Sequence, residues 1–265
     1  MYLDYYGLKA SPFNITSDAG LFFESQSHKE ALAVLFYGIQ EKKGIILITG
    51  EVGTGKTTIC KRALDTLDPR TRISLILNPY FSDVQLLQAI VEDFGLRADS
   101  NNRLDIVKRL NAFLIETASE GGNAVLIIDE AQNLGSRQLE QVRLLSNLET
   151  SQCKLLQIVL VGQPELMEKL NQFNLRQIRQ RIFVKYHLAP LAEEEVKGYV
   201  EFRLKNTGSK DIEITPAGYQ LIYKFSGGIP RLVNMLCDRA LLLGFAEDKK
   251  VLDENVFQAS IAEIK

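Results

Sequence analysis

The sequence predicts an α/β fold: a three-layer core in which helices cover both faces of a parallel sheet, followed by a small all-helical domain. Two observations predict it. Short aliphatic runs alternate with amphipathic segments between about residues 45 and 188, which is typical of parallel strands joined by helical crossovers. After Pro190 only helical patterns follow. We therefore predict a core of residues 1–190 and a helical domain of residues 191–265.

In the first part of the chain, capping and turn residues bound the expected elements. Residues 2–24 are aromatic and irregular. Ser27 followed by Glu30 forms a capping-box pattern at a helix start, and Ser82 followed by Gln85 forms another. In order, we expect a helix that begins at the Ser27 capping box and ends at about residue 41, a strand at 45–49, a helix at 56–67 and a strand at 73–77. A helix from the Ser82 capping box to about residue 94 and a helix at 103–119 follow.

In the second part of the chain, periodicity separates helices from strands. Leu139, Val142, Leu145 and Leu148 recur every three residues and predict a helix. In order, we expect a strand at 124–128, a helix near 137–149, a strand at 155–161, a short helical stretch, a strand at 182–188, and helices at 192–206, 216–225, 230–246 and 253–264.

Composition and charge indicate an ordinary globular protein. The 265 residues are 46% hydrophobic and 24% charged, enough for one large domain or two smaller ones. The net charge of −2 provides no general basic excess for non-specific binding of nucleic acid. The chain shows neither a signal-peptide pattern nor an apolar run near the roughly 18 residues that a membrane span needs. We therefore expect a soluble cytoplasmic protein.

A glycine-rich run follows the expected strand at 45–49 directly. It consists of Gly50, Glu51, Val52, Gly53, Thr54, Gly55, Lys56 and Thr57, with Thr58 next, and has the pattern Gly-x-x-x-x-Gly-Lys-Thr. Glycines let successive backbone N–H groups turn toward phosphate oxygens, and the next helix offers its positive end. Lys56 adds a cation for the β- and γ-phosphates, and the Thr57 hydroxyl can ligate Mg²⁺. The run predicts binding of a nucleoside triphosphate with Mg²⁺.

A pair of carboxylates ends the strand expected at 124–128. Asp129 and Glu130 follow five aliphatic residues directly. A carboxylate at such a strand end can hold Mg²⁺, and the next one can polarise an attacking water. We assign Asp129 to the metal and Glu130 to the water. Together with the glycine-rich run, this pair predicts an ATPase.

Further stretches are similar to one family. They are Tyr5-Tyr6-Gly7-Leu8, Ser11-Pro12-Phe13, His28-x-Glu30-Ala31-Leu32-Ala33, Thr49 to Thr58, Ile128-Asp129-Glu130-Ala131-Gln132-Asn133-Leu134, Leu144 to Thr150, Val161-Gly162-Gln163-Pro164-Glu165-Leu166 and Leu175 to Arg181. Over nearly the whole chain they resemble the general secretion pathway protein A (GspA/ExeA) family of AAA+ ATPases. The transposition regulators of the TniB and TnsC type are related. The resemblance implies a P-loop NTPase core followed by a helical lid.

The resemblance also implies roles for single residues. Gln163, after the strand at 155–161, matches the position that senses the γ-phosphate, although it is also plausible as a turn residue. Arg231, in the stretch Gly228-Ile229-Pro230-Arg231, matches the lid arginine, although it could simply start a helix. Phe13 is expected to line the adenine pocket. Asn78 could hold Glu130 inactive until a partner binds, or serve only as a turn residue before proline.

An arginine before the last core strand of such proteins reaches into the neighbouring subunit's site. Arg176, Arg179 and Arg181 are the candidates, and we favour Arg181, then Arg179, because they lie closest to the strand at Ile182. This role implies a homo-oligomer, a ring or spiral of roughly six subunits. With Lys169 and Lys185, the same arginines could instead form a solvated basic face or a contact to DNA.

Three functions follow from the motifs and the resemblance. The first is an oligomeric ATPase that powers assembly of a secretion or pilus-type envelope complex, through an inner-membrane or envelope-assembly partner. The second is an ATP-dependent regulator that binds duplex DNA. The third, ranked last, is a nucleotide-dependent switch with negligible turnover. Family members often carry a membrane span and a peptidoglycan-binding domain after the ATPase, whereas this sequence ends at Lys265. That difference suggests a truncated chain or a separate partner.

Overall fold

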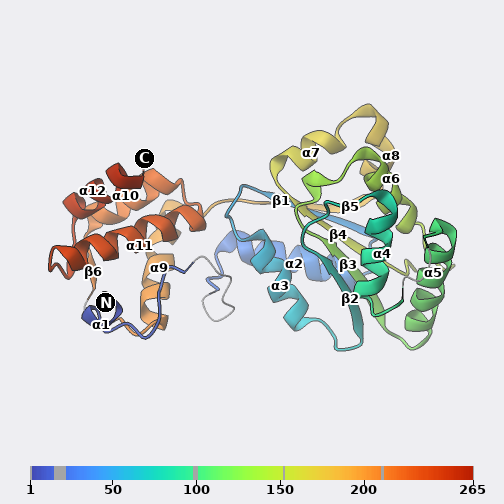
Figure 1. The fold of residues 1–265 in the computed structure, drawn as a ribbon, viewed down its shortest axis with the longest axis horizontal. Helices are drawn as coiled ribbons and strands as arrows, with labels where there is room; N and C mark the ends of the chain where they lie inside the picture. Colours follow the sequence, from blue (N-terminus) through green and yellow to red (C-terminus); the bar gives the residue numbers. More distant parts are fainter. Residues whose placement is uncertain (1, 15–21, 98–100, 152, 210–211, 265) are drawn as a thin grey trace. The chain divides into compact units, whose positions relative to one another are not determined.

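The computed structural model describes most of the chain (Figure 1). The described residues are 2–14, 22–97, 101–151, 153–209 and 212–264. The part of the predicted irregular N-terminus at residues 15–21 therefore lies outside the described residues.

Contacts between residues divide the chain into two compact units. The sheet unit comprises residues 29–50 and 59–188, and the helical unit comprises residues 1–28, 51–58 and 189–265. The N-terminal segment and the glycine-rich loop are thus grouped with the C-terminal helices. The domain boundary near residue 190 stays a prediction.

The sheet unit is built on five parallel strands in the order β2-β3-β4-β1-β5. They are β1 (Ile45–Gly50), β2 (Thr71–Ile76), β3 (Asn123–Ile128), β4 (Gln157–Gly162) and β5 (Ile182–Leu188). β1 and β4 are buried along their whole length, which explains their unbroken aliphatic runs. The predicted α/β class with a parallel sheet is confirmed.

The register of the sheet brings three strand ends to one edge. Leu47 of β1 pairs with Leu160 of β4, and Leu160 pairs with Ile128 of β3. Because these strands are parallel, their carboxyl ends lie at the same edge of the sheet. The residues that follow β3 and β4 are therefore brought together beside the end of β1.

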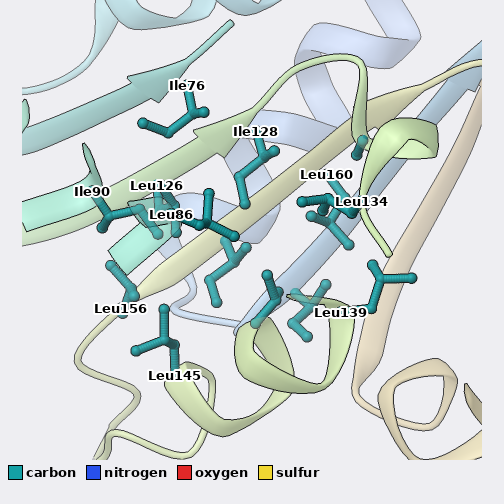
Figure 2. Close-up of a cluster of buried hydrophobic side chains, with 14 of the residues drawn as sticks. Ile76, Leu86, Ile90, Leu126, Ile128, Leu134, Leu139, Leu145, Leu156 and Leu160 are labelled. Atoms are coloured by element: carbon teal, nitrogen blue, oxygen red, sulfur yellow. The ribbon is translucent and has the colours of Figure 1, made fainter. Parts of the chain in front are cut away.

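Helices join the strands and cover the sheet. They are α2 (Gln26–Gln40), α3 (Lys56–Thr66), α4 (Asp83–Asp93), α5 (Arg103–Ser119), α6 (Ser136–Leu145), α7 (Pro164–Leu170) and α8 (Arg176–Arg179), with 3₁₀ helices η2 (Ala131–Asn133) and η3 (Phe173–Leu175). On one face, Leu126, Ile128 and Leu160 of the strands pack with Leu86 of α4 and Leu139 of α6 (Figure 2). Each fully buried leucine stabilises the fold by about 1.5–3 kcal/mol.

The opposite face of the sheet is covered differently. Ile46 and Ile48 of β1 lie on the face opposite the cluster shown in Figure 2, because successive side chains of a strand point to opposite faces of the sheet. Helix α2 packs closely there, and a Cβ atom at Gly38 would overlap the Ile46 side chain. A small residue at this position lets the helix approach the sheet.

The helical unit contains four main helices and a small strand pair. They are α9 (Glu193–Asn206), α10 (Pro216–Ser226), α11 (Pro230–Ala246) and α12 (Glu254–Ile264), with β6 (Glu213–Ile214) parallel to β7 (Val251–Leu252). The expectation that strands stop after Pro190 is wrong in this detail. Two residues per strand are too few to show a period-two pattern in the sequence.

The N-terminal residues are more ordered than predicted. They begin with helix α1 (Tyr2–Tyr5), and the Tyr2 hydroxyl donates to Asp238 Oδ1 of α11 at 2.8 Å. The Tyr6 hydroxyl donates to the Lys249 carbonyl at 2.9 Å, and burial raises the pKa of Tyr6 to about 12. Arg203 Nε donates to the Pro12 carbonyl at 2.6 Å. These contacts hold the segment against the C-terminal part of the helical unit.

Two predicted helix boundaries need correction. The capping box at Ser82 and Gln85 is confirmed, but α2 begins at Gln26, where Ser25 Oγ accepts the His28 N–H at 3.3 Å. Ser25, not Ser27, therefore occupies the capping position.

Helix α6 ends at Leu145, four residues before the predicted end. Beyond it, the Leu148 N–H donates to the Leu145 carbonyl at 3.1 Å, so the chain tightens into three-residue turns and leaves the α-helix. Across the described ranges, no helix has both the length and the apolar character needed to cross a bilayer.

Candidate functional site

The glycine-rich loop connects the end of β1 at Gly50 to the start of α3 at Lys56. Gly53 has φ 84° and Gly55 has φ 100°, a left-handed range in which other residues are strained. The loop can therefore curl only because glycine occupies these positions. The N-terminus of α3 lies at the end of the loop, and the backbone N–H groups of a first helical turn suit an anion.

The cation of this loop lies inside it. Lys56 is only 6% exposed, and its Nζ donates to the Glu51 carbonyl at 2.8 Å. Thr54 Oγ1 donates to the same carbonyl at 2.9 Å. Thr57 and Thr58 are half-buried in the first turn of α3, while Glu51 and Val52 are exposed at the tip. The loop thus carries a preplaced ammonium group beside its backbone donors.

His28 supports the glycine-rich loop from α2. Its Nε2 donates to the Thr54 carbonyl at 3.2 Å, because a carbonyl can only accept. In the neutral imidazole, Nδ1 then accepts the Ser25 hydroxyl proton, with the two atoms 2.5 Å apart. A Cβ atom at Gly55 would lie 3.0 Å from His28 Nε2, so glycine also makes room for the ring.

We predict that protonation of His28 destabilises the helical unit. Burial lowers the pKa of His28 below its ordinary value of 6.5, although the Thr54 carbonyl, Glu195 and Glu24 act in the opposite direction. The unfolded chain therefore takes up this proton first on acidification. The stabilisation is fully present above pH 6.5 and is lost as the pH falls through 6.5 toward the lowered value.

Urea unfolding at pH 7.5 and pH 5.5 measures this effect. The stability lost on acidification should shrink in a His28→Gln variant, which cannot titrate but can still donate to Thr54. His187→Gln, at the only other histidine of the chain, is the matched control. An identical loss of stability in the wild type and in His28→Gln would contradict the assignment.

Arg231 is the second residue of helix α11 and lies next to the glycine-rich loop. Its backbone N–H donates to the Gly53 carbonyl at 3.3 Å, and a Cβ atom at Gly53 would lie 2.5 Å from Arg231 Cβ. The Arg231 side chain itself is exposed. The sequence-predicted lid arginine is therefore adjacent to the loop through its backbone, with its guanidinium accessible.

Asp129 and Glu130 follow β3 at the edge where the carboxyl ends of β1 and β4 also lie. Asp129 is 5% exposed, and its Oδ1 accepts the Glu130 N–H at 2.9 Å. Glu130 is half-buried. The Asp129 carboxylate and the Thr57 hydroxyl are hard oxygen donors, the type that suits Mg²⁺, so the chemistry of the two groups fits this ion.

Two glutamines contact the Glu130 carboxylate. Gln132 Nε2 donates to Glu130 Oε2 at 2.5 Å, and Gln163 Nε2 donates to the same oxygen at 3.3 Å. Gln163 follows β4 directly and precedes Pro164 of α7. The structure thus brings together Glu130 and Gln163, while the roles predicted for them stay predictions.

Two of the candidate trans arginines are on the short α8, and Arg181 follows it by two residues. Arg181 and Arg176 are exposed, and Arg176 lies over the Phe173 ring at 4.4 Å from its centre. Arg179 Nη1 donates to Asn171 Oδ1 at 3.3 Å. Arg181 therefore presents its guanidinium to solvent at the start of β5. Lys169 differs from these arginines, because its Nζ donates to the backbone carbonyls of Gln132 and Leu134.

Two other predicted roles stay predictions. Phe13 is 3% exposed and packs in the hydrophobic core of the helical unit. Asn78 is exposed after β2. In this structure the Glu130 carboxylate accepts hydrogen bonds from Gln132 and Gln163.

Sequence reasoning assigned no role to His28 or Gln132. Both belong to motif stretches, but nothing in the order of residues says that His28 contacts a loop 26 positions away. The available signal for Gln132 was its place two residues after Glu130, on a turn at the end of a strand. The sequence does not reveal where an amide side chain points after such a turn.

Comparison with known proteins identifies the same architecture. Residues 39–170 match a family described as an AAA domain. The chain is 46% identical over 247 residues to the general secretion pathway protein A of Aeromonas hydrophila. That match covers 93% of this chain and 45% of the relative, so the chain spans less than half of the relative's length.

Solved structures show the fold at low sequence identity. The ORC2 protein of Aeropyrum pernix, solved as ADPNP–ADP complexes, has a TM-score of 0.70 at 18% identity and matches 96% of this chain and 72% of its own. Cdc6p of Pyrobaculum aerophilum has a TM-score of 0.72 at 16% identity and matches 91% of this chain and 67% of its own.

Proposed function

This chain belongs to the AAA+ P-loop proteins and is related to general secretion pathway protein A, and from that premise we propose that it binds ATP with Mg²⁺ and hydrolyses ATP to ADP and phosphate. The observation that carries the proposal is the position of Glu130. Its carboxylate follows β3 at the edge where β1 ends and the glycine-rich loop begins. A general base is thus expected where the loop would hold the triphosphate.

In this proposal the loop binds the phosphates. Backbone N–H groups between Gly50 and Thr58 and the N-terminus of α3 contact phosphate oxygens, and Lys56 moves from the Glu51 carbonyl to the β- and γ-phosphates. Thr57 and Asp129 would hold the Mg²⁺, which neutralises charge that develops on the phosphate oxygens. Phe13 is proposed to line the pocket that holds the adenine ring.

The reaction itself requires a base and a charge stabiliser. Glu130 takes a proton from the attacking water, and Gln163 contacts the γ-phosphate that the water attacks. Arg231, whose side chain is exposed next to the glycine-rich loop, is proposed to contact the phosphates that the loop holds. We propose a cytoplasmic location, where ATP is available, and association with the inner face of the membrane through a partner.

We further propose that the protein acts as a homo-oligomer, in a ring or spiral, and powers assembly of a secretion or pilus-type envelope complex. The exposed Arg181 supports the oligomer, because its guanidinium is available to a second copy of the chain. The name of the related Aeromonas hydrophila protein supports a role in secretion. An inner-membrane or envelope-assembly protein is the proposed partner.

We predict that Arg181 acts across a subunit interface, with Arg179 as the next candidate. Arg181→Ala and Glu130→Gln should each be inactive alone, while an equal mixture should regain roughly a quarter of wild-type specific activity. In random mixed assemblies, about one interface in four pairs an intact Glu130 with an intact Arg181 from the neighbour. Steady-state release of phosphate by the two proteins and their mixture measures this.

The control for the loss of activity in Arg181→Ala is Arg137→Ala. This variant removes an exposed arginine from α6 and should keep full activity by itself. Specific activity should also rise with protein concentration, as subunits associate. A mixture as inactive as its components, together with flat specific activity over a dilution series, would exclude shared sites.

A DNA-binding regulator is the second candidate. The exposed Arg176, Arg181 and Lys185, close together in the sequence around the start of β5, favour it. Phosphate contacts by these residues would make DNA binding salt-sensitive. Particle images with a non-hydrolysable ATP analogue distinguish the candidates, since closed rings without DNA support the first and DNA-dependent spirals support the second.

A further inference from the structure

The backbone at Glu130 is strained. Its φ of 50° and ψ of 37° place it in the left-handed region, which is uncommon for residues other than glycine. Such a conformation persists where the surrounding contacts determine it, and it often marks a functional site. The turn delivers the chain into η2 (Ala131–Asn133), so the feature that holds η2 also determines where Glu130 points.

Gln132, in the middle of η2, makes two side-chain hydrogen bonds of opposite polarity. Its Oε1 accepts the backbone N–H of Gln163 at 3.1 Å, and its Nε2 donates to Glu130 Oε2 at 2.5 Å. The orientation of the amide is determined, because a backbone N–H can only donate and therefore faces the carbonyl oxygen. One side chain thus links the turn after β3 to the turn after β4.

The position of Gln132 is itself supported by neighbours. Lys169 Nζ of α7 donates to the carbonyls of Gln132 and Leu134, which anchors both ends of the turn. A Cβ atom at Gly162 would lie 2.8 Å from Gln132 Oε1, so glycine at the end of β4 leaves room for the amide. These contacts all lie within the sheet unit.

We propose that Gln132 is a positioning residue that holds the Glu130 carboxylate and Gln163 in one arrangement for attack of water on the γ-phosphate. This role rests on the proposed ATPase function. Both glutamine amides donate to Oε2, so the other carboxylate oxygen, Oε1, is assigned to the attacking water. A glutamate at position 132 would accept from Gln163 but repel Glu130, which explains why the chemistry needs an amide here.

The test uses variants of the full chain assayed for steady-state ATP hydrolysis. Gln132→Met keeps the length of the side chain and removes both hydrogen bonds. It should lower kcat about 10-fold, the usual effect of losing one hydrogen bond to a charged group, and should leave the KM for ATP within about twofold. Gln132→Glu should lower kcat at least as much. Gln172→Met, at an exposed glutamine before η3, should change neither constant.

A double-mutant cycle separates positioning from a general loss of structure. If Gln132 acts through the base, Gln132→Met should change kcat by less than about twofold once Glu130→Gln is already present. Equal fold-losses in both backgrounds, a raised KM with unchanged kcat, or wild-type kcat in Gln132→Met would overturn the role while the ATPase function stands. A wild-type protein that binds ATP·Mg²⁺ without turnover would overturn the proposed function and this role together.

Discussion

Glu130→Gln is expected to lower kcat for ATP hydrolysis by about 10²- to 10⁴-fold, the contribution typical of a positioned general base. The amide cannot take a proton from the attacking water. It keeps the shape of the side chain and an oxygen that can still accept from Gln132 and Gln163, so the turn after β3 should keep its structure. Binding of ATP·Mg²⁺ should therefore change little. Phosphate release and calorimetric titration with ATP·Mg²⁺ measure the two effects separately.

The matched control for this change is Glu168→Gln, which removes the same charge from an exposed position on α7. Its turnover should equal that of the wild type. Turnover in Glu130→Gln within a few-fold of wild type would assign the base to another residue. Loss of ATP binding in the same variant would show that the carboxylate serves the ligand and not the water.

Lys56→Ala is expected to weaken ATP·Mg²⁺ binding by about 30-fold to several thousand-fold, because truncating one partner of a desolvated charge pair costs about 2–5 kcal/mol. Lys56 is 6% exposed and lies on the inside of the glycine-rich loop, so bulk water cannot replace it at the phosphates. Binding of ADP should weaken less than binding of ATP, since only the triphosphate offers the γ-phosphate. Titration calorimetry with both nucleotides measures the two affinities.

Lys61→Ala is the control for this prediction, because it removes the same charge from an exposed position on the same helix, α3. It should bind ATP·Mg²⁺ with nearly wild-type affinity. Equal affinities of Lys56→Ala and the wild type would place the triphosphate somewhere other than the loop. Equal losses of affinity for ATP and ADP would mean that Lys56 contacts the β-phosphate and not the γ-phosphate.

Most of the fold could be predicted from the residues, because its elements carry strong local signals. Strand β5 and helix α5 begin and end at the residues that periodicity and turn residues predicted. Predictions were wrong where an element was too short to carry a pattern, or where two neighbouring residues suited the same position. The two residues of β6 carry no periodicity, and Ser25 and Ser27 both suit the start of α2.

For the site, the sequence alone determined the kinds of chemistry available. A loop with Gly53 and Gly55 before Lys56 is specified locally, because only glycine adopts its backbone angles without strain. The carboxylates at Asp129 and Glu130 are likewise set by a strand end. Neither inference needs knowledge of distant contacts.

Only the tertiary structure decided which side chains act on these groups. Parallel pairing of β3 with β4 brings Gln163 within 3.3 Å of Glu130, 33 positions earlier in the chain, and lets Gln132 link the two turns. The packing of α2 brings His28 to the Thr54 carbonyl. A hydrogen bond depends on distances and directions within a few tenths of an ångström, and long-range packing sets these where local residue order cannot.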